Sequence, residues 1–240
     1  EVIRKVQEER PDLPGVDPAL ARTLERAGSL KDAESTLVRA MGKAPSSEVL
    51  EALAGFYTRQ KRIGDAIALL NGAVARNPGD DSMVFALATL YEKKGEWQKA
   101  VDKLKPVVER HPDNAQALNF MGYTIATNGG DLDEAEKLVK RALDEKPESP
   151  AFLDSLGWIQ FKKNKLDDAA ESLEKAVEAS PDEATLLEHL GEVSLKLGRK
   201  ARAQECFSRA LELILQSPDD AERPTQKADL ERRLKQLSPN

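Results

Sequence analysis

The chain has 240 residues, of which 32% are charged and only 5% are aromatic, and 36 Lys and Arg against 42 Asp and Glu give a net charge of −6. The two signs of charge are interspersed, which argues against a nucleic-acid-binding protein, because phosphate contacts need a clustered basic face. No apolar run is long enough to span a membrane, and the single Cys206 excludes an internal disulfide. The dominance of Ala, Leu, Glu, Lys and Arg favours helices over strands.

A period of about 34 residues runs along the chain. Small residues recur at Ala33, Ala66, Ala100, Ala135, Ala169 and Ala203. Apolar residues four and seven places after each of them trace one face of a helix. Upstream of most of them lies a second helical pattern, such as Leu50-x-x-Leu53-Ala54. Each repeat is therefore predicted to be a pair of helices.

In chain order, residues 1–13 are expected to hold the second helix of a truncated repeat, because Pro11 precedes Pro45 by 34 residues. Six repeats are then predicted over 14–217, at 14–46, 47–80, 81–114, 115–149, 150–183 and 184–217. Residues that tolerate a left-handed conformation separate the helices of a pair, namely Gly28, Gly95, Gly130, Asn164 and Gly198. Residues 218–240 are predicted to be a capping helix and C-terminal tail with a narrow apolar stripe, Leu230, Leu234 and Leu237.

The repeat unit combines an aliphatic residue, Leu-Gly or Leu-Ala and often Tyr in the first helix with Ala and Leu or Phe in the second. A proline closes successive units, at Pro45, Pro78, Pro112, Pro147 and Pro181. This pattern resembles the tetratricopeptide repeat, or TPR. The resemblance implies an all-α fold, a right-handed superhelical α-solenoid of antiparallel helix pairs with a C-terminal capping helix. It also implies a scaffold that binds a protein or peptide segment on a concave surface.

In such an architecture, the residues one, two and five places after the first aliphatic position of each unit face the concave surface. The expected groove residues are Phe85, Asn119, Phe120, Tyr123, Asp154, Trp158, Phe161, Glu188, His189 and Glu192. Five aromatic residues on one wall indicate an apolar peptide groove, and Asn119 and Asp154 are expected to hold the peptide backbone between acidic walls. The alternative is that Phe120 and Trp158 lean into the core between repeats.

The sequence offers no recognisable catalytic or metal-binding constellation. It contains no Walker loop, nucleophile elbow or HExxH motif. His111 and His189 show no metal-ligand spacing, and Cys206 has no neighbouring base, so we expect an inert thiol. The prediction is a non-enzymatic protein without cofactor or metal.

A more particular resemblance covers repeats four to six. The runs Asn119-Phe120-Met121-Gly122-Tyr123, Leu153-Asp154-Ser155-Leu156-Gly157-Trp158 and His189-Leu190-Gly191-Glu192-Val193 are similar to the C-terminal repeats of bacterial outer-membrane TPR lipoproteins. Some of those act as periplasmic adaptors for carboxyl-terminal processing proteases. The resemblance implies the periplasmic side of the outer membrane, with a lipid anchor before Glu1 as the membrane contact. A cytoplasmic location, and a structural role in an envelope assembly such as a pilotin or motility complex, stay open.

Overall fold

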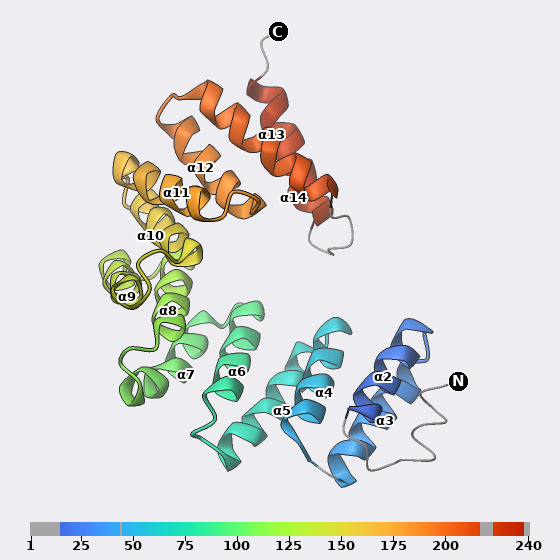
Figure 1. Cartoon of the computed structure of the whole chain (residues 1–240). Coiled ribbons are helices and arrows are strands. Elements are labelled where there is room, and N and C mark those ends of the chain that lie inside the picture. The colour runs from blue at the N-terminus through green and yellow to red at the C-terminus, as the bar shows by residue number, and fades with distance from the viewer. Residues whose placement is uncertain (1–14, 44, 217–222, 238–240) are drawn as a thin grey trace. The chain divides into compact units, whose positions relative to one another are not determined.

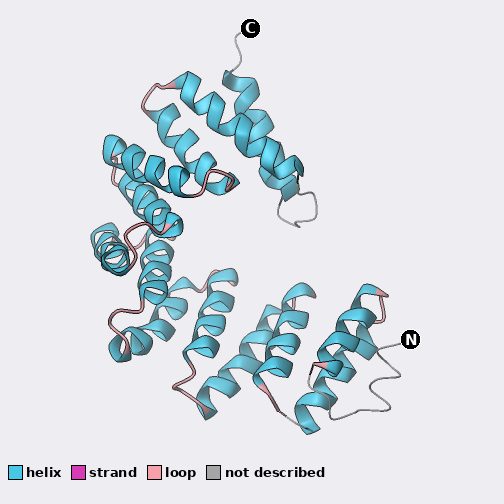
Figure 2. Ribbon diagram, in the orientation of Figure 1, coloured by secondary structure: helices cyan, strands magenta, loops and turns pink. Residues whose placement is uncertain are grey.

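The computed structural model describes residues 15–43, 45–216 and 223–237, and these residues form helices and no strand (Figures 1 and 2). The helix predicted within residues 1–13 lies outside the described residues, and so do 218–222 and 238–240 of the predicted tail. The chain divides into two compact units, residues 1–104 (unit 1) and 105–240 (unit 2).

Unit 1 is built from short antiparallel helix pairs. Its helices are α2 (Val16–Arg26), α3 (Leu30–Lys43), α4 (Ser47–Arg59), α5 (Ile63–Arg76), α6 (Asp81–Lys93) and the first part of α7 (Trp97–Arg110). Polar side chains start two of these helices, because Ser46 accepts the backbone N–H of Val49 and Asp80 accepts that of Met83. Each such cap stabilises its helix by about 1 kcal/mol.

Unit 2 continues the pattern after the last residues of α7. Its helices are α8 (Ala115–Thr127), α9 (Leu132–Glu145), α10 (Pro150–Lys162), α11 (Leu166–Ala179), α12 (Ala184–Lys196), α13 (Lys200–Gln216) and α14 (Arg223–Leu237). The helices α8 and α9, α10 and α11, and α12 and α13 form pairs, and α14 packs against α13 (Figure 1). The first helices of neighbouring pairs also touch, α8 with α10 and α10 with α12.

A residue in the left-handed conformation ends the first helix of each pair. These residues are Gly28, Lys61, Gly95, Gly129, Asn164 and Gly198. In the fourth pair the prediction of Gly130 is wrong by one position, because Gly129 takes the positive φ of 78° and the N–H of Gly130 donates to the carbonyl of Ile125. The extra residue of this turn is therefore placed after the left-handed residue. The side chain of Asp131 then caps α9 by accepting two backbone N–H groups of its first turn.

The core follows the 34-residue period. The six periodic alanines from Ala33 to Ala203 have no exposed surface. Around them the largest fully buried side chains are also periodic, including Leu70, Leu104, Leu173 and Phe207. Burying one such leucine or phenylalanine side chain contributes about 1.5–3 kcal/mol, so the second helices carry much of the apolar stabilisation.

The first helices of unit 2 approach their second helices so closely that only glycine fits at one position. A Cβ on Gly122 would lie 2.7 Å from Val139 Cγ2 and 2.8 Å from the carbonyl oxygen of Ala135. A Cβ on Gly157 would lie 2.6 Å from Leu173 Cγ, and one on Gly191 would overlap the Phe207 ring. The absence of a side chain at these three positions sets the distance between the paired helices.

The apolar stripe of α14 covers the last helix pair. Leu230 is fully buried together with Leu187, Phe207 and Ile214, and Leu234 and Leu237 pack against this cluster. The opposite face of α14 carries the exposed Lys235 and Arg232. The helix thus presents one apolar side to α12 and α13 and one charged side to water.

Candidate partner-binding surface

Three helices of unit 2 present the same three positions on one face. We name these nine residues the unit-2 row: Asn119, Phe120 and Tyr123 on α8, Asp154, Ser155 and Trp158 on α10, and Glu188, His189 and Glu192 on α12. Spacings of one and four residues place the three side chains of each helix on a single face. The predicted groove residue Phe85 lies on α6 of unit 1, where it is half-buried, and is outside the row.

At the centre of the row, Asp154 holds His189 across two repeats. His189 Nδ1 lies 2.7 Å from Asp154 Oδ1, which joins α10 to α12. Asp154 is only 8% exposed. The Nδ1–H of the imidazole donates to this carboxylate, an acceptor-only group when it is ionised. Within the part of the chain that the structure describes, Asp154 Oδ2 and His189 Nε2 have no hydrogen-bond partner, and neither atom is fully buried.

The imidazole of His189 also belongs to an aromatic stack. Its ring lies 4.2 Å from the Trp158 ring at an interplanar angle of 21°. Phe161 stacks on Trp158 at 5.1 Å and 28°, and Lys162 Nζ lies 5.6 Å from the indole centroid. Trp158 remains half-buried. Two of the five predicted wall aromatics, Trp158 and Phe161, therefore form a stack with His189 that joins repeat five to repeat six.

The acidic wall predicted at repeat six is occupied by α14. Gln226 of α14 donates to Glu188, and Arg233 pairs with Glu192 at 2.5 Å. Arg233 also bonds Asp229 and lies 5.5 Å from the centroid of the Phe207 ring. The sequence predicted that Glu188 and Glu192 face a partner. In the structure, residues of α14 contact both carboxylates, which the repeat pattern did not indicate. Burial raises the pKa of Glu188, and the hydrogen bond from Gln226 opposes this rise.

Asn119 lies on α8 and is half-buried. Its Oδ1 is the one buried side-chain nitrogen or oxygen without a hydrogen-bond partner among the described residues. The predicted hydrogen bonding of Asn119 to a peptide backbone stays a prediction. Phe120 and Tyr123, on the same helix, are both half-buried.

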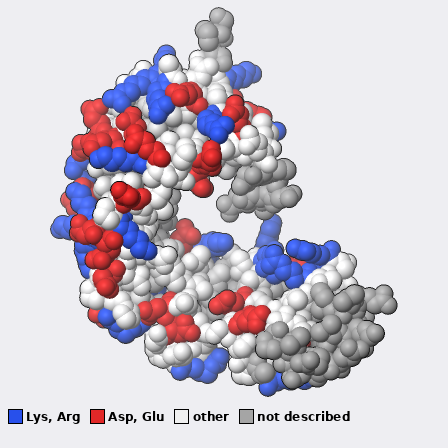
Figure 3. Space-filling view, in the orientation of Figure 1, with Lys and Arg blue, Asp and Glu red and all other residues white. Residues whose placement is uncertain are grey.

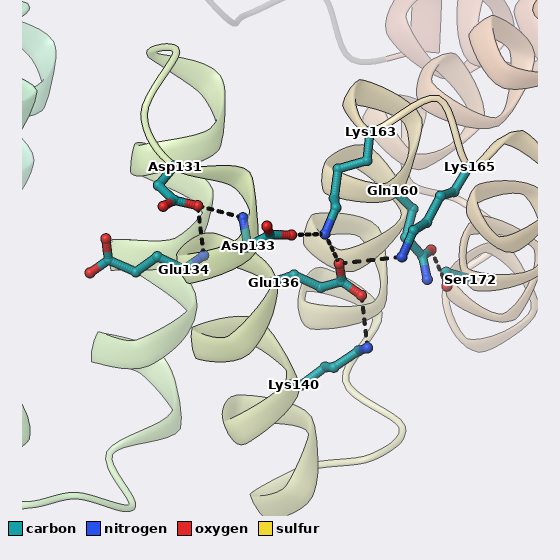
Figure 4. Close-up of polar contacts among 9 residues, drawn as sticks. All are labelled: Asp131, Asp133, Glu134, Glu136, Lys140, Gln160, Lys163, Lys165 and Ser172. Carbon is teal, nitrogen blue, oxygen red and sulfur yellow. Dashed lines mark hydrogen bonds and ion pairs between the residues drawn. The ribbon is translucent and has the colours of Figure 1, made fainter.

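A second polar cluster lies between α9 and the end of α10. Glu136, only 7% exposed, contacts Lys140 at 2.7 Å and Lys163 at 2.5 Å, with Lys165 at 3.7 Å (Figure 4). Lys163 also pairs with Asp133. Hydrogen bonds from Lys140 and Lys163 lower the pKa of Glu136 from 4.5 to about 2. We call Glu136 with Lys140, Lys163 and Lys165 the Glu136 clamp. It was not predicted from the sequence, although Glu136 directly follows the core residue Ala135.

Unit 1 has a polar counterpart to the unit-2 row. A cavity of about 350 Å³ lies between α2 and α4, and Glu25, Glu48, Glu51, Arg22 and Arg59 are among its lining residues. Arg59 binds Glu25 through two N–H groups, with Nε to Oε1 at 2.9 Å and Nη2 to Oε2 at 2.8 Å. Gln60 donates a third hydrogen bond to Glu25 at 3.1 Å. These bonds lower the pKa of Glu25, first through Arg59.

The remaining reactive residues have structural surroundings. Cys206 is a free thiol with 1% exposure, and burial raises its pKa, which agrees with the expected inert cysteine. His111 is exposed, far along the chain from His189. Within the described ranges, no three His, Cys, Asp or Glu side chains gather as a metal site needs. Figure 3 shows both signs of charge intermixed on the face that it draws.

None of the described helices is both long and apolar enough to cross a membrane. Among proteins of known sequence, the chain is similar to TPR repeat-containing protein PA4667 of Pseudomonas aeruginosa, with 32% identity over 163 residues, which are 63% of this chain and 27% of the relative. It is also similar to cellulose synthase operon protein C of Pseudomonas fluorescens, with 30% identity over 138 residues, 54% of this chain and 11% of the relative. The chain thus spans about a quarter of the length of the first relative and about a tenth of the second.

Solved structures share the fold. A tetratricopeptide repeat protein of Parabacteroides merdae matches with a TM-score of 0.74 and 19% identity, covering 98% of this chain and 89% of its own. A TPR protein of Thermus thermophilus matches with a TM-score of 0.65 and 22% identity, covering 78% of this chain and 100% of its own. Both likenesses agree with the predicted all-helical solenoid. The family model for the tetratricopeptide repeat matches residues 19–81, 85–150 and 155–221, well over half of the sequence, and the chain therefore belongs to the tetratricopeptide repeat family.

Proposed function

We propose that the chain is a scaffold that binds another protein, and that the unit-2 row holds a segment of that partner. Tetratricopeptide repeats generally mediate protein–protein interaction and are not typically enzymes. The observation that carries the choice of surface is the Asp154–His189 pair, a polar contact between α10 and α12 that lies beside a stack of rings. Polar atoms of this kind, next to half-buried aromatic side chains, are typical of the centre of a protein interface.

The rigidity of the row supports the same role. The rings of Trp158 and His189 stack on each other. Asp154, which lies on α10 together with Trp158, also holds the imidazole of His189 by a hydrogen bond. Side chains that are fixed before binding lose little conformational entropy when a partner arrives. A segment lying along α8, α10 and α12 would therefore meet a preformed surface.

The finer proposal is a periplasmic adaptor for a carboxyl-terminal processing protease, attached to the outer membrane through a lipid anchor. It is supported by the resemblance of repeats four to six to the lipoproteins of that type, and by the bacterial origin of the most similar relatives reported above. A second candidate is a structural part of an envelope assembly. It is the alternative that the repeat pattern leaves open, because a stacked array of helix pairs can also bind neighbours through its second helices.

The test uses the full chain, immobilised and exposed to a purified carboxyl-terminal processing protease and to a bacterial envelope extract, with bound proteins identified by mass spectrometry. We expect Trp158→Ala combined with Tyr123→Ala to weaken binding by roughly 30-fold or more, as interface aromatic residues commonly do. Tyr57→Ala in unit 1 is the matched control, because Tyr57 is also half-buried but lies outside the row.

Circular dichroism must show native helicity in both variants for the comparison to count. Undiminished binding by a folded Trp158 and Tyr123 variant would exclude the row as the binding surface. Lys137→Glu and Glu178→Lys change exposed charges on the second helices α9 and α11. Loss of binding in these two variants alone would favour the envelope-assembly candidate.

A further inference from the structure

We infer that Asn128 is a site of covalent modification, where the side-chain amide is lost without an enzyme and the residue becomes aspartate or isoaspartate. Asn128 and Gly129 lie in the turn between α8 and α9. The inference goes beyond the proposed function, because it concerns the chemistry of this turn and does not depend on any partner.

The reaction requires an asparagine that is followed by a glycine. The backbone nitrogen of the glycine attacks Cγ of the asparagine side chain, and the new N–Cγ bond closes a succinimide ring. The Cγ–Nδ2 bond breaks, and ammonia leaves with the amide proton of the glycine. Water then opens the ring at either carbonyl, which gives aspartate or, with the backbone rerouted through the side chain, isoaspartate. Glycine favours the attack because it has no side chain to shield its nitrogen. The chain contains two such pairs, Asn71-Gly72 and Asn128-Gly129.

The pair Asn128-Gly129 is exposed and lies outside the helices. Within the described residues, the N–H groups of Asn128 and Gly130 donate to carbonyl oxygens of α8, whereas no backbone carbonyl accepts that of Gly129. The ψ of 14° places the Gly129 nitrogen beside the backbone nitrogen of Asn128 rather than beside its Cβ, so ring closure needs a rotation. This rotation gives up turn contacts such as the hydrogen bond from Gly130 to Ile125. Exposed turns open at low free energy.

The pair Asn71-Gly72 has the same chemistry in the opposite surroundings. It lies inside α5, where the N–H of Gly72 belongs to the helical ladder. Nδ2 of Asn71 donates to the hydroxyl of Tyr91 at 3.0 Å. The rotation needed for ring closure would break α5 between the buried Leu70 and Ala73. We therefore expect the two pairs to react at different rates in the folded chain, although their sequences are alike.

Loss of the amide changes the end of α8. Nδ2 of Asn128 donates to the carbonyl oxygen of Thr124 at 2.9 Å and so satisfies one of the last carbonyls of that helix. An aspartate carboxylate has no proton to donate there, and its negative charge is unfavourable at a helix C-terminus. Isoaspartate also lengthens the backbone within a turn that Gly129 holds in the left-handed conformation. The modification therefore loosens the last turn of α8, the helix that carries Phe120 and Tyr123 of the unit-2 row.

The experiment incubates the full chain in mildly alkaline buffer and follows both pairs by proteolytic digestion, chromatography and mass spectrometry. Chromatography separates peptides with aspartate from those with isoaspartate, and the mass distinguishes both from asparagine. In the folded chain we expect both products to accumulate at Asn128. The reaction at Asn71 should be at least roughly tenfold slower, because it waits for the opening of α5. In guanidinium chloride, where structure protects neither pair, the two rates should become similar.

Two variants identify the site and its effect. Asn128→Gln keeps the amide on a side chain that is longer by one methylene and closes a ring much more slowly, so product at this position should fall below detection while Asn71 is unaffected. Asn128→Asp reproduces the aspartate product. Amide hydrogen exchange in the last turn of α8 should be severalfold faster in Asn128→Asp than in Asn128→Gln. Circular dichroism establishes that both variants are folded.

Equal rates at Asn128 and Asn71 in the folded chain would overturn the inference, and so would a reaction at Asn128 that begins only after unfolding in guanidinium chloride. Unchanged hydrogen exchange in folded Asn128→Asp would refute the effect on α8. The proposed function is decided separately, by partner binding of the Trp158 and Tyr123 variant.

Discussion

Units 1 and 2 carry different small residues at the contact between the two helices of a pair. At the position where a first helix meets its second helix, unit 1 carries Ala54 and Ala88, both buried, whereas unit 2 carries Gly122, Gly157 and Gly191. A Cβ has room in unit 1, but in unit 2 it would overlap the neighbouring helix. The two kinds of helix pair therefore differ at this position by one methyl group.

The faces of the first helices differ in a matching way. In unit 1 the ion pair of Arg59 and Glu25 lies at the wall of the cavity between α2 and α4. In unit 2 the carboxylate of Asp154 contacts the His189 imidazole of the next repeat. Contacts between the first helices of neighbouring repeats are thus an ion pair in unit 1 and a hydrogen-bonded aromatic stack in unit 2.

The largest expected effect comes from filling the glycine position. Gly122→Ala should destabilise the protein by about 2 kcal/mol, because an overpacking cost of about 3 kcal/mol against Val139 and the Ala135 carbonyl outweighs the gain of about 1 kcal/mol in helix propensity. Urea unfolding measures this difference.

The matched control for this substitution is Gly42→Ala in α3. A Cβ there would meet nothing within 4 Å, so the variant should gain up to about 1 kcal/mol from helix propensity alone. If both substitutions stabilised the protein equally, the helix pairs of units 1 and 2 would pack alike at these positions. The proposed difference between the two units would then be wrong.

A medium effect is expected from the clamp on Glu136. Its pKa in the folded chain, about 2, is below the usual 4.5, so the clamp stabilises the fold above pH 4.5 and this contribution is lost as the pH falls toward 2. The contribution is about 1–2 kcal/mol after allowance for the exposed Lys140. Glu136→Gln should flatten the acid limb of the stability profile, measured by urea unfolding between pH 5 and pH 2, to about that extent.

The control for the acid limb is Glu171→Gln. Glu171 pairs with Lys175 on the exposed face of α11, where solvent screens the pair, so this variant should keep the wild-type pH dependence. If Glu171→Gln flattened the profile as much as Glu136→Gln, the acid limb would not originate in the clamp.

The smallest effect is expected in unit 1. Arg59→Ala breaks the two-pronged pair with Glu25, but Arg59 is 43% exposed, so the loss should stay below about 1 kcal/mol and shrink further in high salt. Thermal unfolding at low and high salt would test it. A loss as large as that of Gly122→Ala would mean that unit 1 depends on this ion pair as unit 2 depends on its packing.

The sequence predicted the fold because the period, the core alanines and the glycines are local signals that repeat. It placed the left-handed residue of the fourth turn at Gly130, since an inserted residue can be absorbed on either side of that conformation. Only the hydrogen bond from Gly130 to Ile125 fixes the choice of Gly129.

The candidate site was less predictable. The sequence placed Asp154, Trp158 and His189 on one predicted concave face, but it assigned each of them to a partner rather than to one another. Stacking and hydrogen bonding across repeats depend on rotamers, which spacing does not determine. The contacts of Gln226 and Arg233 with α12 come from a helix that does not follow the repeat pattern, so periodicity gave no signal for them.

The labelling rate of the buried Cys206 thiol can report how often the helices around it open in unit 2, which also carries the candidate site. Cys206 packs with Ala169, Leu173 and Leu190 and is reached by solvent only when the layer of α11, α12 and α13 opens. The rate at which a thiol reagent labels the native protein therefore reports the opening free energy of this layer. Slower labelling on addition of a partner would give the binding energy at the row without any change to the sequence.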